Sequence, residues 1–343
     1  AWAEPHFGRM SAYNGLFPGR PRFPFGETPR EAYNFSLLDL DAMFAAHEIS
    51  AQRSPAGSRP ETEFRVFLIG DSSVWGTLLR PEETLAGQLN AYHLAAADGR
   101  VIRFYNLGYP TISLTKDLDL LDRAMGYRPD LVIWLVTLEA FPRDKQLAVP
   151  LLQNNPESTA ALLARYKLDL PGSLVQPAFF DRTLIGRRKN LADLIRLQFY
   201  GVLWAATGID QVYPLDFPRA QVDLEADPTF HEKEDLQPAD LAFEVLAAGQ
   251  SAVANTPILL VNEPIMISSG ANSDIRYNFY YPRLAYDQYR DYLSAQVKEL
   301  GLDYIDAWDL VPQQDFTNSA IHLNRAGTAR LVEVVKDFIL SRQ

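Results

Sequence analysis

The sequence contains no cysteine among its 343 residues, which excludes disulfide bonds and thiolate metal sites. Basic residues are also in the minority: 32 lysines and arginines stand against 43 aspartates and glutamates, for a formal net charge of −11. That balance argues against nucleic acid as a partner, because neutralising phosphates requires a basic surface. No apolar run approaches the ~20 residues that a membrane-spanning helix needs.

Motifs for cofactors and metals are missing too. No Gly-x-Gly-x-x-Gly or Walker loop follows an expected strand, and no His-x-x-x-His spacing occurs. We therefore expect neither a nucleotide cofactor nor a metal ion. The chain begins with alanine instead of methionine, and we expect either that a signal or anchor segment has been removed or that the chain has been trimmed.

Residues 1–60 are rich in proline, glycine and aromatic residues, as in NGLFPGRPRFPFGETP, and contain one helical pattern, at 37–47. This composition is typical of a segment that wraps around a surface or forms a stalk. We therefore place the folded domain at 61–343. The chain as a whole is 47% hydrophobic and 22% charged, which is enough apolar material for a large core.

Beyond residue 60, apolar segments alternate with amphipathic ones. The expected strands are 64–70, 101–108, 130–138, 256–264 and 302–308. The expected helices between and after them are 81–96, 113–127, 286–300 and 326–340. Strands joined by crossover helices form parallel sheets with helices on both faces. We therefore predict a three-layer α/β/α domain of the flavodoxin-like kind, with a five-stranded parallel sheet in the order 2-1-3-4-5.

The alternation is interrupted at 151–255. This stretch is expected to hold helices at 158–166, 189–206 and 237–254, separated by loops rich in proline and aspartate. We interpret it as a helical insertion that covers the carboxyl edge of the sheet as a lid, because that edge is where α/β folds place their sites.

Residues that can carry chemistry lie at or beyond the carboxyl ends of the expected strands. They are Asp71, Ser72, Asn106, Gly108, Thr137, Asn272, Arg276 and His322. Because the carboxyl ends of parallel strands meet at one edge, Ser72 and His322 are expected to converge there. A serine hydroxyl beside an imidazole is the nucleophile–base pair of acyl transfer. Structural interpretations stay open: Gly-Asp-Ser-Ser is also an ordinary turn, and His322 is also placed to cap the last helix.

The motifs around these residues resemble those of the SGNH/GDSL hydrolases. GDSSVWG at 70–76 resembles the nucleophile block, YNLGYP at 105–110 the second block, and AIHLNRAG at 320–327 the last block. The resemblance covers residues 64–140 and 256–340. It implies an SGNH-type α/β fold in which Ser72 is the nucleophile and His322 the base. It also implies that the backbone N–H groups of Ser72 and Gly108 form the oxyanion hole.

One departure from the family pattern concerns the oxyanion hole. In the third block the family usually has an asparagine whose side chain donates to the oxyanion, and Leu138 stands there in this chain. Thr137 or Asn272 are candidate replacements, and the donor is otherwise absent.

A second departure concerns the third member of the triad. The family has an acid three residues before the histidine, where this chain has Ser319, or four residues before it in relatives with longer turns, where this chain has Asn318. Asp315 lies further upstream. We predict that Asp315 or Asn318 lies within hydrogen-bond reach of the His322 ring, ~2.6–3.2 Å.

The remaining polar residues are candidates for substrate binding: Asp71, Asn106, Thr137, Asn272 and Arg276. Arg276 is suited to clamp a sugar or carboxylate, or to stabilise its own loop through an ion pair. Together these features predict a serine esterase or O-acyltransferase that acts on ester-linked acyl groups, above all acetyl groups, of carbohydrates or small esters. The alternative is an inactive SGNH-fold binding or scaffold protein of the cell envelope. The branch of the family that the chain resembles is exported or membrane-anchored, which implies an extracytoplasmic location and an amino-terminal membrane tether.

Overall fold

A computed structural model of the chain describes Leu40 and residues 61–174, 178–180, 183–186, 188–208, 236–317 and 319–342. The stalk segment predicted at 1–60 therefore lies outside the described residues, apart from helical Leu40, and so do the centre of the predicted insertion and Asn318. The chain divides into two compact units. One consists of residues 1–58 and 147–213, and the other of residues 59–146 and 214–343.

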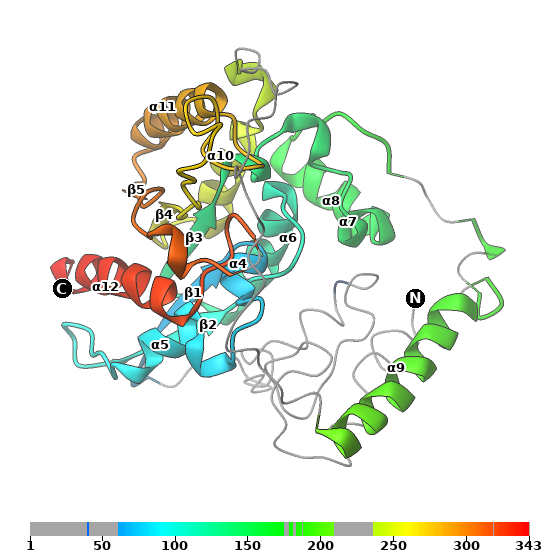
Figure 1. The fold of residues 1–343 in the computed structure, drawn as a ribbon. Coiled ribbons are helices and arrows are strands. Elements are labelled where there is room, and N and C mark those ends of the chain that lie inside the picture. Colours follow the sequence, from blue (N-terminus) through cyan, green and yellow to red (C-terminus); the bar gives the residue numbers. More distant parts are fainter. Residues whose placement is uncertain are drawn as a thin grey trace. The chain divides into compact units, whose positions relative to one another are not determined.

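The larger unit is built on a five-stranded sheet in which every neighbouring pair of strands is parallel. Its strands are β1 (Glu63–Ile69), β2 (Val101–Asn106), β3 (Leu131–Val136), β4 (Ile258–Asn262) and β5 (Asp303–Asp306). They lie in the order β2-β1-β3-β4-β5 (Figure 1). In the central register, Phe67 of β1 is opposite Tyr105 on one side and Val132 on the other. The predicted fold class and strand order are confirmed.

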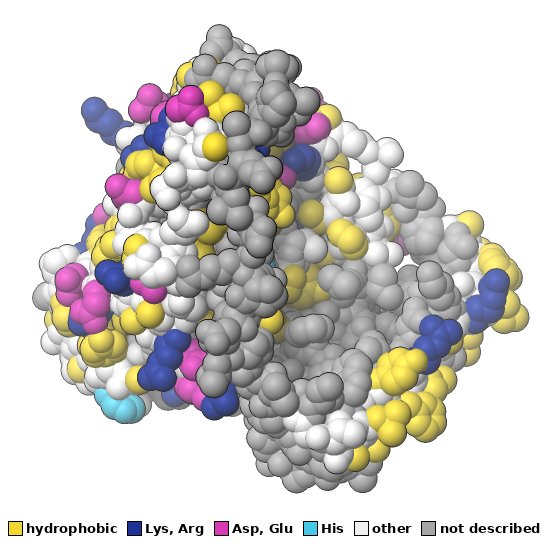
Figure 2. Space-filling model, in the orientation of Figure 1, with side chains coloured by type: hydrophobic (Ala, Val, Ile, Leu, Met, Phe, Trp, Pro, Cys, Tyr) yellow, Lys and Arg dark blue, Asp and Glu magenta, His cyan; other side chains and the backbone are white. Residues whose placement is uncertain are grey.

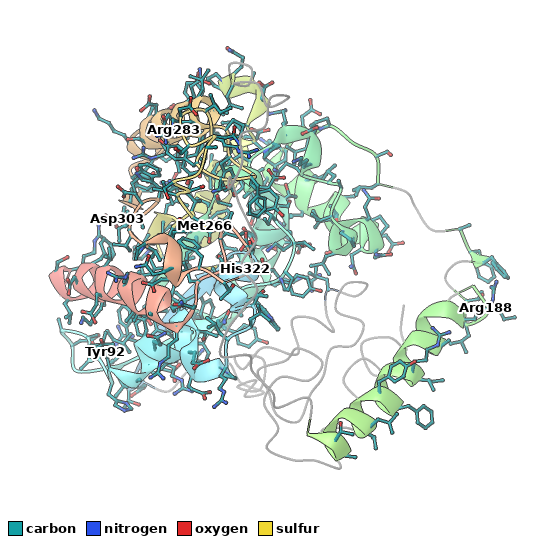
Figure 3. The ribbon with its side chains drawn as sticks, viewed as in Figure 1. Tyr92, Arg188, Met266, Arg283, Asp303 and His322 are labelled. Atoms are coloured by element: carbon teal, nitrogen blue, oxygen red, sulfur yellow. The ribbon has the colours of Figure 1, made fainter. Side chains whose placement is uncertain are left out.

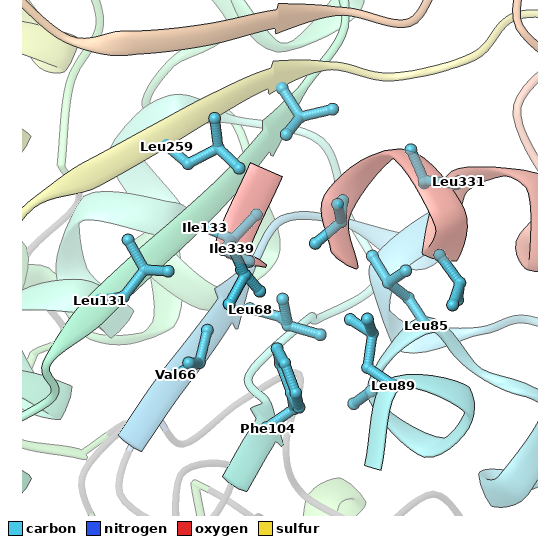
Figure 4. Close-up of a cluster of buried hydrophobic side chains, with 14 of the residues drawn as sticks. Val66, Leu68, Leu85, Leu89, Phe104, Leu131, Ile133, Leu259, Leu331 and Ile339 are labelled. Atoms are coloured by element: carbon cyan, nitrogen blue, oxygen red, sulfur yellow. The ribbon is translucent and has the colours of Figure 1, made fainter. Parts of the chain in front are cut away.

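Helices α5 (Leu85–Ala91) and α12 (Arg325–Ser341) cover one face of the sheet. Alternate strand residues such as Val66, Leu68 and Ile133 point to this face (Figure 4). They are fully buried in one cluster with Leu89 and Val335 of the two helices. Removing this apolar surface from water stabilises the fold by about 25 cal/mol per Å².

The opposite face carries the larger side chains of the same strands. Trp134 of β3 is almost fully buried, and its Nε1 donates to Asp117 of α6 (Leu114–Ala124) at 3.1 Å. The Trp134 ring also lies close to Gly249 of α10 (Phe243–Val253), which packs against α6. Near β4, helix α11 (Arg283–Leu300) buries Tyr286 and Tyr289. The sheet thus has helices on both faces, as the three-layer prediction required.

The smaller unit contains α7 (Pro150–Asn154), α8 (Pro156–Tyr166) and α9 (Arg188–Thr207). Asn155, between the first two helices, accepts a hydrogen bond from the Leu40 N–H at 3.4 Å. Helix α9 exposes apolar side chains, among them Phe199 and Leu203 (Figure 2). Helix α10 falls within the stretch 151–255 that we expected as the insertion, but it belongs to the sheet-bearing unit. The role of the rest of that stretch as a lid stays a prediction.

Short 3-10 helices complete the described structure at Pro81–Glu83, Met125–Tyr127, Leu138–Ala140, Arg143–Lys145, Pro238–Asp240 and Gln313–Asp315. In the part of the chain that the structure describes, no helix combines the length and the apolar character needed to cross a membrane.

Candidate active site

Ser72 and His322 meet at the carboxyl edge of the sheet. The Ser72 Oγ lies 2.8 Å from the His322 Nε2, within hydrogen-bond distance. Strand β1 ends at Ile69, and Ser72 follows three residues later. His322 lies in the loop that leads into α12 (Figure 3). The convergence that strand order and the placement of polar residues predict is therefore present in the structure.

A one-turn helix, α4 (Ser72–Trp75), presents the serine. Asp71 caps this helix: its Oδ1 accepts a hydrogen bond from the Ser73 N–H at 2.7 Å. The helix ends at Gly76, whose φ of 83° lies in the left-handed region that favours glycine. The Gly76 N–H then donates to the Ser72 carbonyl at 3.1 Å. The sequence GDSSVWG therefore encodes a strand end, a cap, one helical turn and its stop.

The loop after β2 touches this turn directly. Asn106 is buried, and its Nδ2 donates to the carbonyl of Val74 at 3.0 Å. A Cβ on Gly108 would lie 2.4 Å from the Trp75 nitrogen, so only glycine lets these two backbone segments come so close. Gly108 is thus required beside the nucleophile for packing, whatever its role in catalysis.

The two predicted oxyanion donors differ in their present partners. The Ser72 N–H stands at the first position of α4, where the helix itself supplies no acceptor. The Gly108 N–H donates to the Asn106 Oδ1 at 2.9 Å. It can serve an oxyanion only if that bond is exchanged or shared.

A tight loop holds His322. The Thr317 N–H and hydroxyl both donate to the His322 carbonyl, at 2.8 Å and 3.1 Å. Phe316 and Leu323 form an antiparallel bridge across the same loop. Burial lowers the pKa of the His322 imidazole below its ordinary value, and the negative charge of Asp71 opposes that shift. At neutral pH the ring is therefore free of a second proton and able to accept one from Ser72.

Asp315, one of the two candidates for the third member of the triad, contacts residues on either side of the start of α12. The Asp315 Oδ2 accepts a hydrogen bond from the Arg330 Nε of α12 at 3.0 Å, and the Asp315 carbonyl accepts one from the Asn324 N–H at 2.8 Å. The Asp315 carboxylate thus has an ion-pair partner of its own. Because Asn318 lies outside the described residues, the prediction that one of the two contacts the His322 ring stays a prediction.

Most of the predicted substrate-binding residues have structural partners. Thr137 is fully buried and shares a hydrogen bond of 2.9 Å with the Tyr281 hydroxyl. Leu138 is also buried and begins a 3-10 helix. Asn272 is buried, and its backbone carbonyl accepts a hydrogen bond from the N–H of Arg276 at 3.0 Å within the loop between β4 and α11. Contact of Asp71, Asn106, Thr137, Asn272 and Arg276 with substrate stays a prediction.

The sequence analysis missed a buried ion pair behind the nucleophile. Lys116 of α6 is fully buried, and its Nζ lies 2.6 Å from the Asp117 Oδ1. The same ammonium donates to the carbonyls of Gly70 at 2.9 Å and Tyr109 at 3.0 Å, and so joins the loops that follow β1 and β2. Burial raises the pKa of the Asp117 carboxyl, and the Lys116 charge opposes this. The sequence carries no signal for this pair, because lysine and aspartate are ordinarily exposed.

Glu263, which directly follows β4, is a second residue of the site to which the sequence analysis gave no role. It is buried, and its Oε2 accepts a short hydrogen bond from the Ser73 hydroxyl. Burial, together with the charge of Asp71, raises the pKa of the Glu263 carboxyl well above its ordinary value. Its position at the carboxyl end of an expected strand is the signal that the sequence offered. Among the described residues, no group of three or more His, Cys, Asp or Glu side chains is arranged to hold a metal ion.

No family model matches the chain, and no curated protein sequence matches it. Similar solved structures include a member of the lipolytic G-D-S-L family from Veillonella parvula, which is 10% identical with a TM-score of 0.38 and covers 80% of this chain and 97% of its own. Another is Axe2, an acetylxylan esterase from Geobacillus stearothermophilus, at 12% identity and a TM-score of 0.39, covering 80% of this chain and 94% of its own.

A third similar structure is Est24, a carbohydrate acetylesterase from Sinorhizobium meliloti, at 14% identity and a TM-score of 0.36, covering 82% of this chain and 100% of its own. The first of these structures belongs to the lipolytic G-D-S-L family, and the other two are acetyl esterases. At such identities and TM-scores the likeness bears on neither the activity nor the substrate of this chain.

Proposed function

We propose that the protein is a serine esterase or O-acyltransferase of the SGNH type, acting on ester-linked acetyl groups of carbohydrates or similar small esters. The observation that carries this proposal is the 2.8 Å approach of the Ser72 Oγ to the His322 Nε2. A partly buried imidazole with a lowered pKa, hydrogen-bonded to a serine at the start of a short helix, has the geometry of a nucleophile and its general base.

The chemistry begins when the His322 Nε2 accepts the hydroxyl proton of Ser72 as the Oγ attacks the acyl carbonyl carbon. The resulting oxyanion lies near the Ser72 N–H, at the positive end of α4. Collapse of the tetrahedral intermediate breaks the ester C–O bond, and the protonated His322 returns its proton to the departing alcohol. Water, or a sugar hydroxyl in a transferase, then attacks the acyl-Ser72 with His322 again as the base, and the serine is regenerated.

Turnover of a small acetyl ester by wild type and by Ser72→Ala tests this proposal. We expect the substitution to lower kcat by roughly 10³-fold or more, because the covalent route is lost. Equal rates of the two proteins would exclude Ser72 as the nucleophile. Adding an oligosaccharide acceptor then separates the two reactions: a transferase forms an acetylated sugar, and a hydrolase releases acetate at an unchanged rate.

Two observations favour a second candidate function, a non-catalytic binding or scaffold protein with the same fold. Leu138 supplies no polar group where the family has its side-chain oxyanion donor, and it is buried. The Gly108 N–H is engaged by the Asn106 side chain. For such a protein we expect an acetylated polysaccharide to bind with the same affinity to wild type and to Ser72→Ala, and no ester turnover by either.

An extracytoplasmic location and an amino-terminal tether belong to the same proposal, and they are supported by the sequence resemblance alone. Expression of the full natural chain in its own host, followed by separation of membrane, soluble and external fractions, tests both. Recovery of the protein in the cytoplasmic fraction would contradict them.

A further inference from the structure

Ser73, the neighbour of the nucleophile, is held by two carboxyl groups. Its N–H donates to the Asp71 Oδ1 at 2.7 Å, and its hydroxyl donates to the Glu263 Oε2. The Asp71 contact is local, since it lies within the same turn. The Glu263 contact spans 190 residues of sequence and ties α4 to the end of β4.

We propose that Glu263 is a positioning residue for the Ser72 nucleophile, acting through its hydrogen bond with the Ser73 hydroxyl. This inference rests on the proposed function. Helix α4 has four residues and therefore few hydrogen bonds of its own, so contacts from outside the helix fix its orientation. Since Ser72 and Ser73 share a peptide bond, a shift of Ser73 moves the Ser72 Oγ relative to the His322 Nε2.

Glu263 is itself firmly placed. Its N–H donates to the Val136 carbonyl at 2.9 Å, beside the last pair of residues between β3 and β4. The residue is 2% exposed, and its Oε1 has no hydrogen-bond partner among the described residues. A group anchored in this way by the sheet can act as a fixed reference point for the turn that carries the nucleophile.

The charges around Glu263 add a dependence on pH. Asp71 lies before α4, and Lys116 and Asp117 belong to α6, where they form their own ion pair. The phenols on which the Glu263 charge acts come from two further segments: Tyr281 precedes α11, and Tyr286 and Tyr289 belong to α11.

In this setting burial and the Asp71 charge raise the pKa of the Glu263 carboxyl well above its ordinary value. When it ionises at higher pH, a second negative charge arises beside Asp71 in a buried space, where like charges repel strongly. We therefore expect activity to fall on the alkaline side.

Three variants test the proposal in the full chain: Glu263→Ala, Glu263→Gln and Ser73→Ala. Glu139→Gln is the matched control, because it neutralises a partly exposed carboxylate just after the neighbouring strand β3. The measurements are kcat and KM for a small acetyl ester across the pH range, with melting temperatures to establish folding. Glu263→Gln keeps an oxygen that accepts from Ser73 but cannot ionise.

We expect Glu263→Ala and Ser73→Ala each to lower kcat about tenfold to a hundredfold with little change in KM, because the nucleophile is misplaced. A double variant that combines Ser73→Ala with Glu263→Ala should have a kcat no lower than either single variant, because both substitutions remove the same contact. Glu263→Gln should keep most of the activity that wild type shows below the raised pKa of Glu263 and lose the fall above it, and Glu139→Gln should match wild type.

An unchanged kcat in Ser73→Ala and Glu263→Ala, or an alkaline fall that persists in Glu263→Gln, overturns the positioning role while leaving the proposed function intact. A wild-type protein that turns over no ester overturns both. If Glu263→Ala fails to fold, Ser73→Ala and the pH profile of Glu263→Gln decide the question.

Discussion

The Ser72 Oγ and the His322 Nε2 lie 2.8 Å apart although 250 positions separate the two residues in the chain. The parallel sheet produces this contact: Ser72 is delivered by the end of β1, and His322 by the loop that follows β5 and leads into α12. The order of the strands brings the two residues to the same edge of the sheet, and the short turns that carry them set the distance between the two side chains.

The acid limb of the pH profile is expected to reflect His322. Burial lowers the pKa of its imidazole below the ordinary 6.5, and only the neutral ring can take the Ser72 proton. As pH falls through this lowered pKa, kcat/KM should fall in proportion to the fraction of His322 rings that remain neutral. Measured kcat/KM of ester turnover should therefore show an apparent acid-side pKa below 6.5. An apparent pKa above 6.5 would mean that a carboxylate paired with His322 raises the imidazole pKa more than burial lowers it.

Replacement of the buried lysine should damage the fold. Lys116→Met leaves the Asp117 carboxylate without its cation and the carbonyls of Gly70 and Tyr109 without their donor. We expect the free energy of unfolding to fall by about 3–5 kcal/mol, as when one partner of a buried ion pair is removed. The control is Lys145→Met, which breaks a largely exposed pair with Glu139 and should cost less than about 1 kcal/mol. Urea unfolding measures both, and equal losses would contradict the account.

Gly108 should tolerate no side chain. A Cβ there would lie 2.4 Å from the Trp75 nitrogen, and backbone atoms cannot move aside as the end of a side chain can. We expect Gly108→Ala to lower the free energy of unfolding by about 1–3 kcal/mol and to disturb Ser72 at the same time. Gly126→Ala is the control, because no atom lies within 4 Å of its added Cβ. A Gly108→Ala protein as stable and as active as wild type would be inconsistent with this contact.

Stability should depend on pH through Glu263. A carboxyl whose folded pKa is raised contributes stability that is fully present below its ordinary pKa of 4.5 and is lost as pH rises through the raised value. Glu263→Gln lacks this titration. The difference in melting temperature between the variant and wild type should therefore shift in favour of the variant as pH rises from the ordinary pKa of 4.5 through the raised value. Parallel melting curves across this range would show that Glu263 does not titrate as described.

The third triad position can be settled by two substitutions. Because Arg330 already pairs with the Asp315 carboxylate, we expect Asp315→Asn to change kcat less than about threefold while lowering stability slightly. If Asn318 faces the ring, Asn318→Asp should raise kcat by adding the charge that stabilises an imidazolium. Turnover rates of the two variants beside wild type distinguish the cases. A loss of orders of magnitude in Asp315→Asn would identify Asp315 as the partner.

The fold was predictable because its signals are local and repeated. Nearly unbroken apolar strands such as 130–138 can only be buried on both faces, and crossover helices then make the sheet parallel. The ends were less predictable: the helix expected at 81–96 is interrupted at Thr84, where a 3-10 helix stops and α5 begins, and its final turns are absent. There the capping hydroxyl of Thr84 outweighs the periodicity.

The site was predictable as far as Ser72 and His322, since both lie where strands deliver polar residues. Its supports were not. Lys116 and Asp117 stand in an amphipathic helix where charged residues are ordinarily exposed, and their burial follows from the approach of Gly70 and Tyr109, which is a tertiary contact. Likewise, the partnership of Asn106 with Gly108 could not be distinguished in the sequence from a free oxyanion donor.

The central claim is that Ser72 is an activated nucleophile, and labelling with a fluorophosphonate tests it most directly. The reagent phosphonylates an activated serine hydroxyl and leaves an ordinary one untouched, so it requires no knowledge of the substrate. The account predicts stoichiometric labelling of wild type at Ser72, located by peptide mass spectrometry, and no labelling of Ser72→Ala or His322→Ala. Wild-type protein that stays unlabelled at long times, or that is labelled equally without His322, would contradict it.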